Sequence, residues 1–192
     1  MASGYSERFG RQNKLLLPFR GKPLARYTLE LAAAMDFSGG VYYIAASDKV
    51  AALAAGIPGI NVIKNTAPEK GLRESVRLGI EACGLAACPA ADYFIFFPCD
   101  MPFLDTFTVQ RILDEREPGC IVEPRFREEP GNPGLFSAVF RDELLSLKEG
   151  ETPRLIKTRH PEALRVIEIT NPQILRDIDD DETFIQLHHT VK

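Results

Sequence analysis

Basic side chains and small residues crowd the first stretch of the chain. Residues 1–22 carry five lysines and arginines against a single acid, Glu7, although the whole chain of 192 residues has a formal net charge of −4. The basic residues are Arg8, Arg11, Lys14, Arg20 and Lys22. The run Ala2-Ser3-Gly4 precedes them, and such small residues let backbone N–H groups approach phosphate oxygens. A solvated basic turn is one interpretation, and the glycines at positions 4, 10 and 21 favour a polyphosphate cradle.

Carboxylates that could hold a divalent cation occur in two places. Asp100 follows the apolar run from Tyr93 to Phe97, and Met101-Pro102 then turns the chain. Near the C-terminus, Asp177 and Asp179 alternate around Ile178, so both would point to one face of an extended segment. Mg²⁺ is usually bound by one or two carboxylates together with substrate phosphates and water. The alternatives are a turn or cap for Asp100 and a solvated acidic turn ahead of a final helix for the other pair.

Several other chemistries lack the residues they need. The sequence has no Gly-x-x-x-x-Gly-Lys-Ser/Thr loop and no Gly-x-Gly-x-x-Gly fingerprint, which argues against ATPase and dinucleotide sites. The four cysteines have no Cys-x-x-Cys spacing, so we expect buried free thiols. Net negative charge argues against nucleic acid as a partner. With no apolar run of membrane-spanning length and no signal region, we expect no membrane partner and a cytoplasmic protein.

Alternating strands and helices must position these side chains. The β-branched and aromatic runs 41–47, 60–64, 92–98 and 163–169 are typical of strands. Apolar stripes and capping signals predict helices over 23–35, 71–83, 107–115 and 153–160, with Asp105 or Thr106 as the cap of the third. This order favours an α/β fold with a mostly parallel central sheet covered on both faces, as one domain over 1–192. We expect residues 123–134 to form an irregular loop over the site.

Several segments resemble one family of enzymes. The opening "ASGYSERFGRQNKLLLPFRGKPL", together with "GLRESVRLGI", "FFPCDMPFLD", "GNPGLFS" and "LRDIDDDETF", is similar to the signature segments of molybdenum cofactor cytidylyltransferase-like nucleotidyltransferases. The resemblance covers about the whole chain and implies a three-layer, Rossmann-like nucleotidyltransferase fold, Mg²⁺ dependence and a nucleoside triphosphate substrate. In this family the opening loop follows a short central strand, and only Met1 stands in that place here. This strand is absent from the sequence, so we expect the natural chain to start before Met1, or else the sheet to be rearranged or supplemented.

The resemblance also implies roles for individual residues. Lys14 would stabilise the α- and β-phosphates, Arg8 the β/γ end, and Asp100 and Asp179 would bind the metal. The residues expected to contact the nucleotide are Ala2, Ser3, Gly4, Ser6, Lys14 and Ser75. Asn132 and Pro133 would contact the acceptor. Departures from the family pattern occur at Cys99, Asn132 and Asp180-Asp181, where the family has a glycine, a histidine and Thr-Pro.

Three hypotheses about function follow. The first is transfer of CMP from CTP to molybdopterin with release of pyrophosphate, with a molybdoenzyme or its chaperone as protein partner. The second is a related transferase that uses GTP or acts on a sugar or alditol phosphate. The third is a non-catalytic nucleotide-binding regulatory domain. Because Ala2-Ser3-Gly4 resembles the cytidylyl branch of the family, CTP is the expected substrate.

Overall fold

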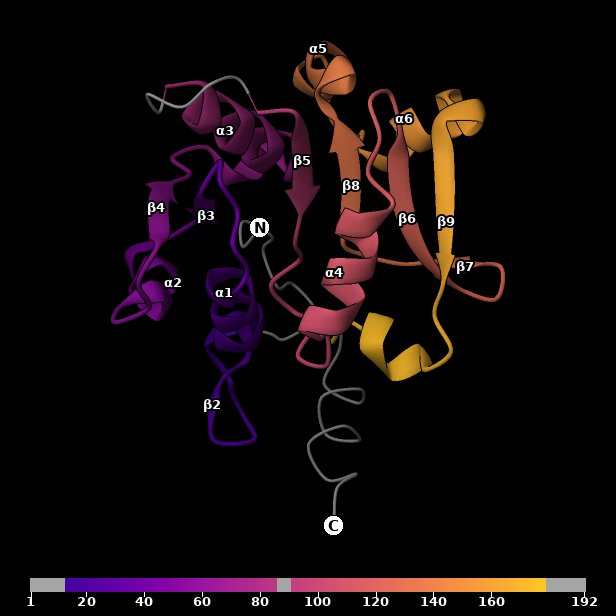
Figure 1. Ribbon diagram of the computed structural model, residues 1–192. Coiled ribbons are helices and arrows are strands. Elements are labelled where there is room, and N and C mark those ends of the chain that lie inside the picture. The colour runs from indigo at the N-terminus through magenta and orange to yellow at the C-terminus, as the bar shows by residue number, and fades with distance from the viewer. Residues whose placement is uncertain (1–12, 86–90, 179–192) are drawn as a thin grey trace.

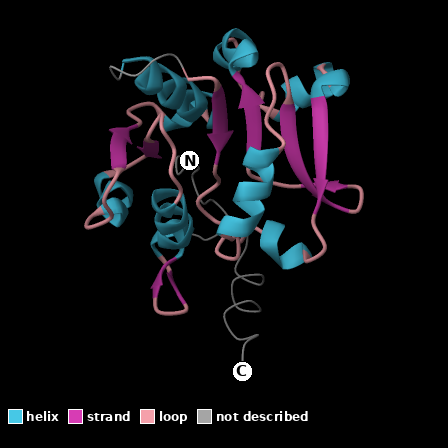
Figure 2. Ribbon diagram, in the orientation of Figure 1, coloured by secondary structure: helices cyan, strands magenta, loops and turns pink. Residues whose placement is uncertain are grey.

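The computed structural model describes residues 13–85 and 91–178 (Figures 1 and 2). The predictions for Ala2, Ser3, Gly4, Ser6, Arg8 and Asp179 lie outside the described residues.

Among the described residues, seven strands form two sheets, and two further short strands form a separate hairpin. Strands β3 (Val41–Ala45) and β4 (Ile60–Lys64) pair in parallel. The larger sheet has the order β5 (Tyr93–Phe96), β8 (Gly134–Ser137), β6 (Ile121–Phe126) and β9 (Leu164–Glu168), and the short strand β7 (Glu129–Pro130) pairs with the end of β6. Strand β6 pairs with β9 in parallel, and β8 runs antiparallel to both β5 and β6, so β5, β6 and β9 share one direction. The α/β fold with a mostly parallel sheet is therefore confirmed, with β8 as the reversed strand.

The prediction of an irregular loop over residues 123–134 is largely wrong. Strand β6 continues to Phe126 and forms a hairpin with β7 (Glu129–Pro130), which leaves only a short irregular segment before β8. Pro124 within the strand and the Gly/Pro-rich residues after it hid this strand, because proline argues against a central strand and such clusters are typical of loops. The side chains of Glu123 and Arg125 lie on one face of β6 and form an ion pair there.

The expected central strand is not found in the described part of the chain. Within residues 13–85 and 91–178, no strand bridges β3 to β5, and each belongs to its own sheet. In Figure 1, β3 and β4 lie to the left of β5, with helix α3 above them.

Helices cover the strands from both sides. The longer helices are α1 (Leu24–Ala34), α3 (Leu72–Leu85) and α4 (Thr106–Asp114), and the short ones are α2 (Asp48–Ala51), α5 (Arg141–Leu145) and α6 (Arg154–Arg159). Asp105 caps α4, because its side chain accepts a hydrogen bond from Thr108 N. Helix α4 lies in front of β8 and β6, and α6 lies behind them (Figure 1), which gives the three layers.

Short elements complete the chain. They are the hairpin strands β1 (Pro18–Phe19) and β2 (Lys22–Pro23) and the 3₁₀ turns at Lys14–Leu16, Ala52–Ala54, Pro68–Lys70, Ala138–Phe140, Pro161–Ala163 and Pro172–Leu175. The first of these turns and the hairpin join the opening of the chain to α1.

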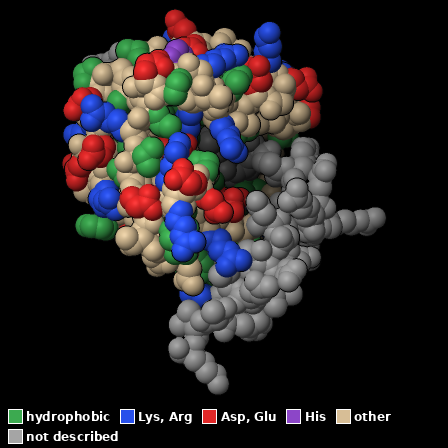
Figure 3. All heavy atoms as spheres, turned by 90° about the vertical axis from the view of Figure 1, so that its right-hand side faces the viewer, with side chains coloured by type: hydrophobic (Ala, Val, Ile, Leu, Met, Phe, Trp, Pro, Cys, Tyr) green, Lys and Arg blue, Asp and Glu red, His purple; other side chains and the backbone are tan. Residues whose placement is uncertain are grey.

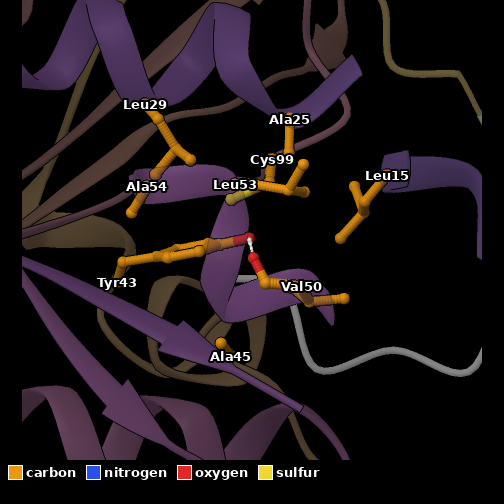
Figure 4. Close-up of a cluster of buried hydrophobic side chains, with 9 residues drawn as sticks. All are labelled: Leu15, Ala25, Leu29, Tyr43, Ala45, Val50, Leu53, Ala54 and Cys99. Atoms are coloured by element: carbon orange, nitrogen blue, oxygen red, sulfur yellow. Dashed lines mark hydrogen bonds between the residues drawn. The ribbon is translucent and has the colours of Figure 1, made fainter. Parts of the chain in front are cut away.

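One buried cluster packs α1 and α2 against β3 (Figure 4). At its centre, Tyr43 donates a hydrogen bond to the carbonyl of Val50 over 3.2 Å, and burial raises the pKa of Tyr43 above its usual value. Cys99 borders the same cluster, and burial raises the pKa of its thiol. Cys99 and Cys120 are buried free thiols as expected, and Cys83 is half-buried. The buried thiol of Cys99 anchors the segment that carries Asp100.

The exposed face that includes the β9 edge carries acidic and basic side chains intermixed (Figure 3). No helix in the described part of the chain is both long enough and apolar enough to cross a membrane.

Candidate active site

Lys14 is held in place by a short turn at the start of the described chain. The side chain of Asn13 accepts a hydrogen bond from Leu15 N over 3.0 Å and so caps the turn Lys14–Leu16. Leu15 is buried against α1 and β3. Because Leu15 faces the core, its neighbour Lys14 is directed away from it, toward the end of β5.

Asp100 lies past the carboxyl end of β5, between two buried residues. Cys99 is 3% exposed and Met101 is 1% exposed, and they anchor the segment on both sides of the aspartate. In open α/β sheets, ligands bind outside the carboxyl ends of the strands, which is where this carboxylate lies.

The third component of the site comes from the C-terminal part of the chain. Ile178 is fully buried against Phe19 and Leu24. Its backbone N–H donates to the carbonyl of Asp100 over 3.0 Å. Its own carbonyl accepts a hydrogen bond from Lys14 Nζ over 2.9 Å. The residue before Asp179 is therefore bonded to both other segments.

These three segments meet at one ion pair. Lys14 Nζ lies 2.7 Å from Asp100 Oδ2, and the two side chains are 15% and 17% exposed. The sequence predicted that Lys14 and Asp100 would share a site, and the structure brings them into contact. Residues 14, 100 and 178 come from widely separated parts of the chain, so the contact depends on the whole fold.

The other oxygen of Asp100 makes the site suitable for a cation. Oδ1 is buried and has no hydrogen-bond partner within the described part of the chain. Leaving a buried carboxylate oxygen unsatisfied is costly, so such an atom calls for an additional ligand. No group of three or more His, Cys, Asp or Glu side chains forms a metal cluster among the described residues. One carboxylate with substrate phosphates is nevertheless a common arrangement for Mg²⁺, and Asp100 fits it.

Ile178 should contribute strongly to stability because it fastens the C-terminal segment to the β1–β2 hairpin. We expect Ile178→Ala to lower the free energy of unfolding by about 2–4 kcal/mol, since it removes a fully buried side chain. Val166→Ala, at a position 46% exposed, should change it by less than about 0.5 kcal/mol. Urea denaturation measures both, and equal effects would show that the Ile178 contact is dispensable.

The basic residues of the hairpin have structural partners. Lys22 forms an ion pair with Glu30 of α1, and its Nζ lies 4.0 Å from the centre of the Tyr27 ring. The guanidinium of Arg20 lies 5.0 Å from the centre of the Phe103 ring. Lys22 thus fastens the hairpin to α1.

Ser75 lies in the first turn of α3 and is buried, with 1% exposure. It lines a cavity of about 650 Å³ between α3, β3 and β5, together with Gly79 and Ile80. This position suits the predicted contact with base or ribose only if the nucleotide enters that cavity.

The predicted acceptor residues lie at the sheet edge where β5 ends. Asn132 is exposed and Pro133 is buried, and the peptide bond between them is cis. They lead directly into Gly134, which pairs with Phe96 at the end of β5. Asp177, the other carboxylate considered for the metal, is exposed.

The sequence analysis missed one buried charged group near this edge. Glu123 of β6 forms ion pairs with Arg125 of the same strand and with Lys157 of α6, as described below. The only sequence signal was a glutamate and an arginine two residues apart in a segment that we assigned to a loop.

Comparison with known proteins identifies the family. Residues 1–164 match the model of the MobA-like NTP transferase domain. Molybdenum cofactor guanylyltransferase of Cupriavidus metallidurans is 32% identical over 114 residues, which are 58% of this chain and 50% of the relative. The chain therefore matches about half the length of that relative. Nicotine blue oxidoreductase of Paenarthrobacter nicotinovorans is 24% identical over 97% of this chain and 93% of its own length.

Solved structures agree on the fold. The protein Rv0371c of Mycobacterium tuberculosis H37Rv is 23% identical, with a TM-score of 0.77 over 98% of this chain and 95% of its own. A second structure of Rv0371c is a complex with manganese, and it matches with a TM-score of 0.73 at 22% identity over 95% of this chain and 94% of its own. These likenesses confirm the expected Rossmann-like fold, and the family match confirms the expected resemblance and enzyme class: the chain belongs to the MobA-like NTP transferase domain family of nucleotidyltransferases.

Proposed function

We propose that this protein is a Mg²⁺-dependent nucleotidyltransferase that transfers CMP from CTP to molybdopterin and releases pyrophosphate, with residues 1–192 acting as one domain. The observation that carries the proposal is the 2.7 Å contact between Lys14 Nζ and Asp100 Oδ2 at the carboxyl end of β5. In such a site, a cation that can bind phosphates is in direct contact with a carboxylate that can bind a metal.

In the proposed reaction, an oxygen of the acceptor phosphate attacks the α-phosphorus, and the bond from that phosphorus to the bridging oxygen of pyrophosphate breaks. Negative charge builds on the leaving oxygens, so positioning and charge neutralisation supply most of the catalysis. Lys14 would bind the α- and β-phosphates, and its contact with Ile178 holds the ammonium in position. Arg8, from the segment ahead of it, would hold the β/γ end.

Asp100 would hold the metal through Oδ1, the oxygen that has no hydrogen-bond partner among the described residues. Asp179 would be the second carboxylate, since its neighbour Ile178 is bonded to the backbone of Asp100. Bound there, Mg²⁺ would neutralise charge on the phosphate oxygens. The manganese complex of Rv0371c, which shares the fold, supports a divalent cation in general.

The choice of nucleotide is tested most directly by pyrophosphate release. The full chain would be incubated with Mg²⁺, molybdopterin and each of CTP, GTP, ATP and UTP in turn. We expect CTP to give the highest rate, on the ground that Ala2-Ser3-Gly4 resembles the cytidylyl branch. The guanylyltransferase relative makes GTP the main competitor, and preference for GTP would correct the nucleotide.

The choice of acceptor is tested in the same assay. Molybdopterin would be replaced by sugar and alditol phosphates, and product formation only with those would move the protein to the second hypothesis. Binding of CTP without release of pyrophosphate for any acceptor would support a regulatory domain. A molybdoenzyme or its chaperone is the protein partner we propose to receive the product.

A further inference from the structure

A buried charged cluster lies between strand β6 and helix α6. Glu123 is 3% exposed, and both of its carboxylate oxygens are engaged. Oε1 lies 2.8 Å from Arg125 Nε, and Oε2 lies 2.7 Å from Lys157 Nζ. The side chain of Lys157 is 11% exposed and that of Arg125 is 27% exposed. We call these three residues the β6–α6 cluster.

The two cations of the cluster, Arg125 and Lys157, share a single carboxylate, that of Glu123. One positive charge therefore has no counter-charge within the cluster, and burying charge is costly unless it is fully compensated. Burial lowers the pKa of Lys157, although its hydrogen bond to Glu123 opposes that shift. Within the described part of the chain, Lys157 Nζ makes one hydrogen bond, and neither Nη atom of Arg125 makes any. The cluster thus retains donors that a bound anion could satisfy.

The cluster lies at the same edge of the sheet as the candidate active site. A Cβ added to Gly134 would lie 3.1 Å from Lys157 Nζ, so the ammonium sits directly over the backbone of that glycine. Gly134 pairs with Phe96, the last residue of β5, and Asp100 follows four residues later. The absence of a side chain at residue 134 is what lets Lys157 reach this edge. Asn132 and Pro133 immediately precede Gly134.

We propose that Arg125 and Lys157 bind an anionic group of the acceptor, of the phosphate class, and that Glu123 is the positioning residue that aligns them. The inference rests on the proposed function for the identity of the ligand as acceptor. Arg125 offers its two Nη groups to the anion, in the bidentate geometry that guanidinium and phosphate favour. Lys157 adds a point charge from the other side of Glu123.

The test follows inorganic phosphate binding by NMR of the full chain. The Arg125 Nε–H resonance, assigned by its loss in Arg125→Met, should shift saturably as phosphate is added. The Arg127 Nε–H resonance is the control, because Arg127 lies two residues further on and stacks on Phe126 with its guanidinium 5.0 Å from the ring centre. In Lys157→Met, the phosphate concentration at the midpoint of the Arg125 shift should rise at least about tenfold, or about 1.4 kcal/mol.

Two results would overturn the inference. One is an Arg125 resonance that does not move, and the other is one that moves only in parallel with that of Arg127. A purely structural ion pair predicts the first result, and general screening by salt predicts the second. Circular dichroism shows whether Lys157→Met is folded. If it is not, Lys157→Arg, which keeps the charge, takes its place in the test and should retain phosphate binding.

A separate measurement keeps this inference apart from the proposed function. If the enzyme is active, Arg125→Met should raise KM for the phosphorylated acceptor at least tenfold and leave KM for the triphosphate within twofold. If no triphosphate gives pyrophosphate, the proposed function fails, and the NMR titration still decides whether the cluster binds phosphate.

Discussion

Replacing Asp100 by asparagine should reduce metal-dependent pyrophosphate release by about 10²–10³-fold while the protein remains folded. Asparagine has nearly the same shape, so Cys99 and Met101 keep the segment anchored on both sides. The change removes the negative charge that pairs with Lys14 and that would bind the metal. Steady-state rates over a range of Mg²⁺ concentrations, with saturating triphosphate, measure the effect.

The matched control is Asp105→Asn, five residues further along the chain. It removes one negative charge as well, but asparagine caps a helix about as well as aspartate, so α4 and the rate should be unchanged. If Asp100→Asn kept the parent rate at every metal concentration, Asp100 would have no part in the mechanism. Equal losses in both variants would point to a general effect of charge.

Replacing Lys14 by methionine should lower kcat/KM for the triphosphate by about 10²-fold or more. Lys14 is the ammonium that lies at both Asp100 and the carbonyl of Ile178, so its removal takes away the fixed cation at the proposed phosphate site. The loss should appear mainly in kcat if Lys14 acts on charge that develops in the transition state, and mainly in KM if it only binds substrate. Initial rates over a range of triphosphate concentrations separate the two.

Lys22→Met is the control for this variant. It removes an equal charge from the same basic segment, but Lys22 pairs with Glu30 and packs on Tyr27 away from the ion pair. We expect a lower thermal stability and little change in kcat/KM. A Lys22→Met enzyme as impaired as Lys14→Met would place the hairpin in the phosphate site and contradict the assignment.

A charge-conserving variant adds a second check on Lys14. Arginine at this position keeps the positive charge but replaces a compact ammonium by a larger planar group. Because Lys14 is 15% exposed and fits between a carboxylate and a carbonyl, Lys14→Arg should recover only part of the lost activity. Full recovery would mean that charge alone matters at this position.

Local patterns in the sequence determined the elements and the class of fold. Strand β4 has the predicted bounds, and α1, α3 and α4 lie within about two residues of theirs, because apolar periodicity and capping residues are local properties. The basic opening and the aspartate after an apolar strand were likewise visible as residue types. The resemblance to the nucleotidyltransferase family predicted that Lys14 and Asp100 would share a site.

Tertiary structure alone decided how those residues are held. Ile178 is hydrogen-bonded to Lys14, which is 164 positions away in the sequence, and to Asp100. No pattern of residue types in the sequence reveals such contacts. The reversed strand β8 and the β6–α6 cluster could not be predicted for a related reason. Glu123 has a residue type common in exposed loops, and only its ion pairs with Lys157 and Arg125 allow it to be buried. Burial of a charged side chain depends on partners distant in sequence, and only the folded chain brings those partners together.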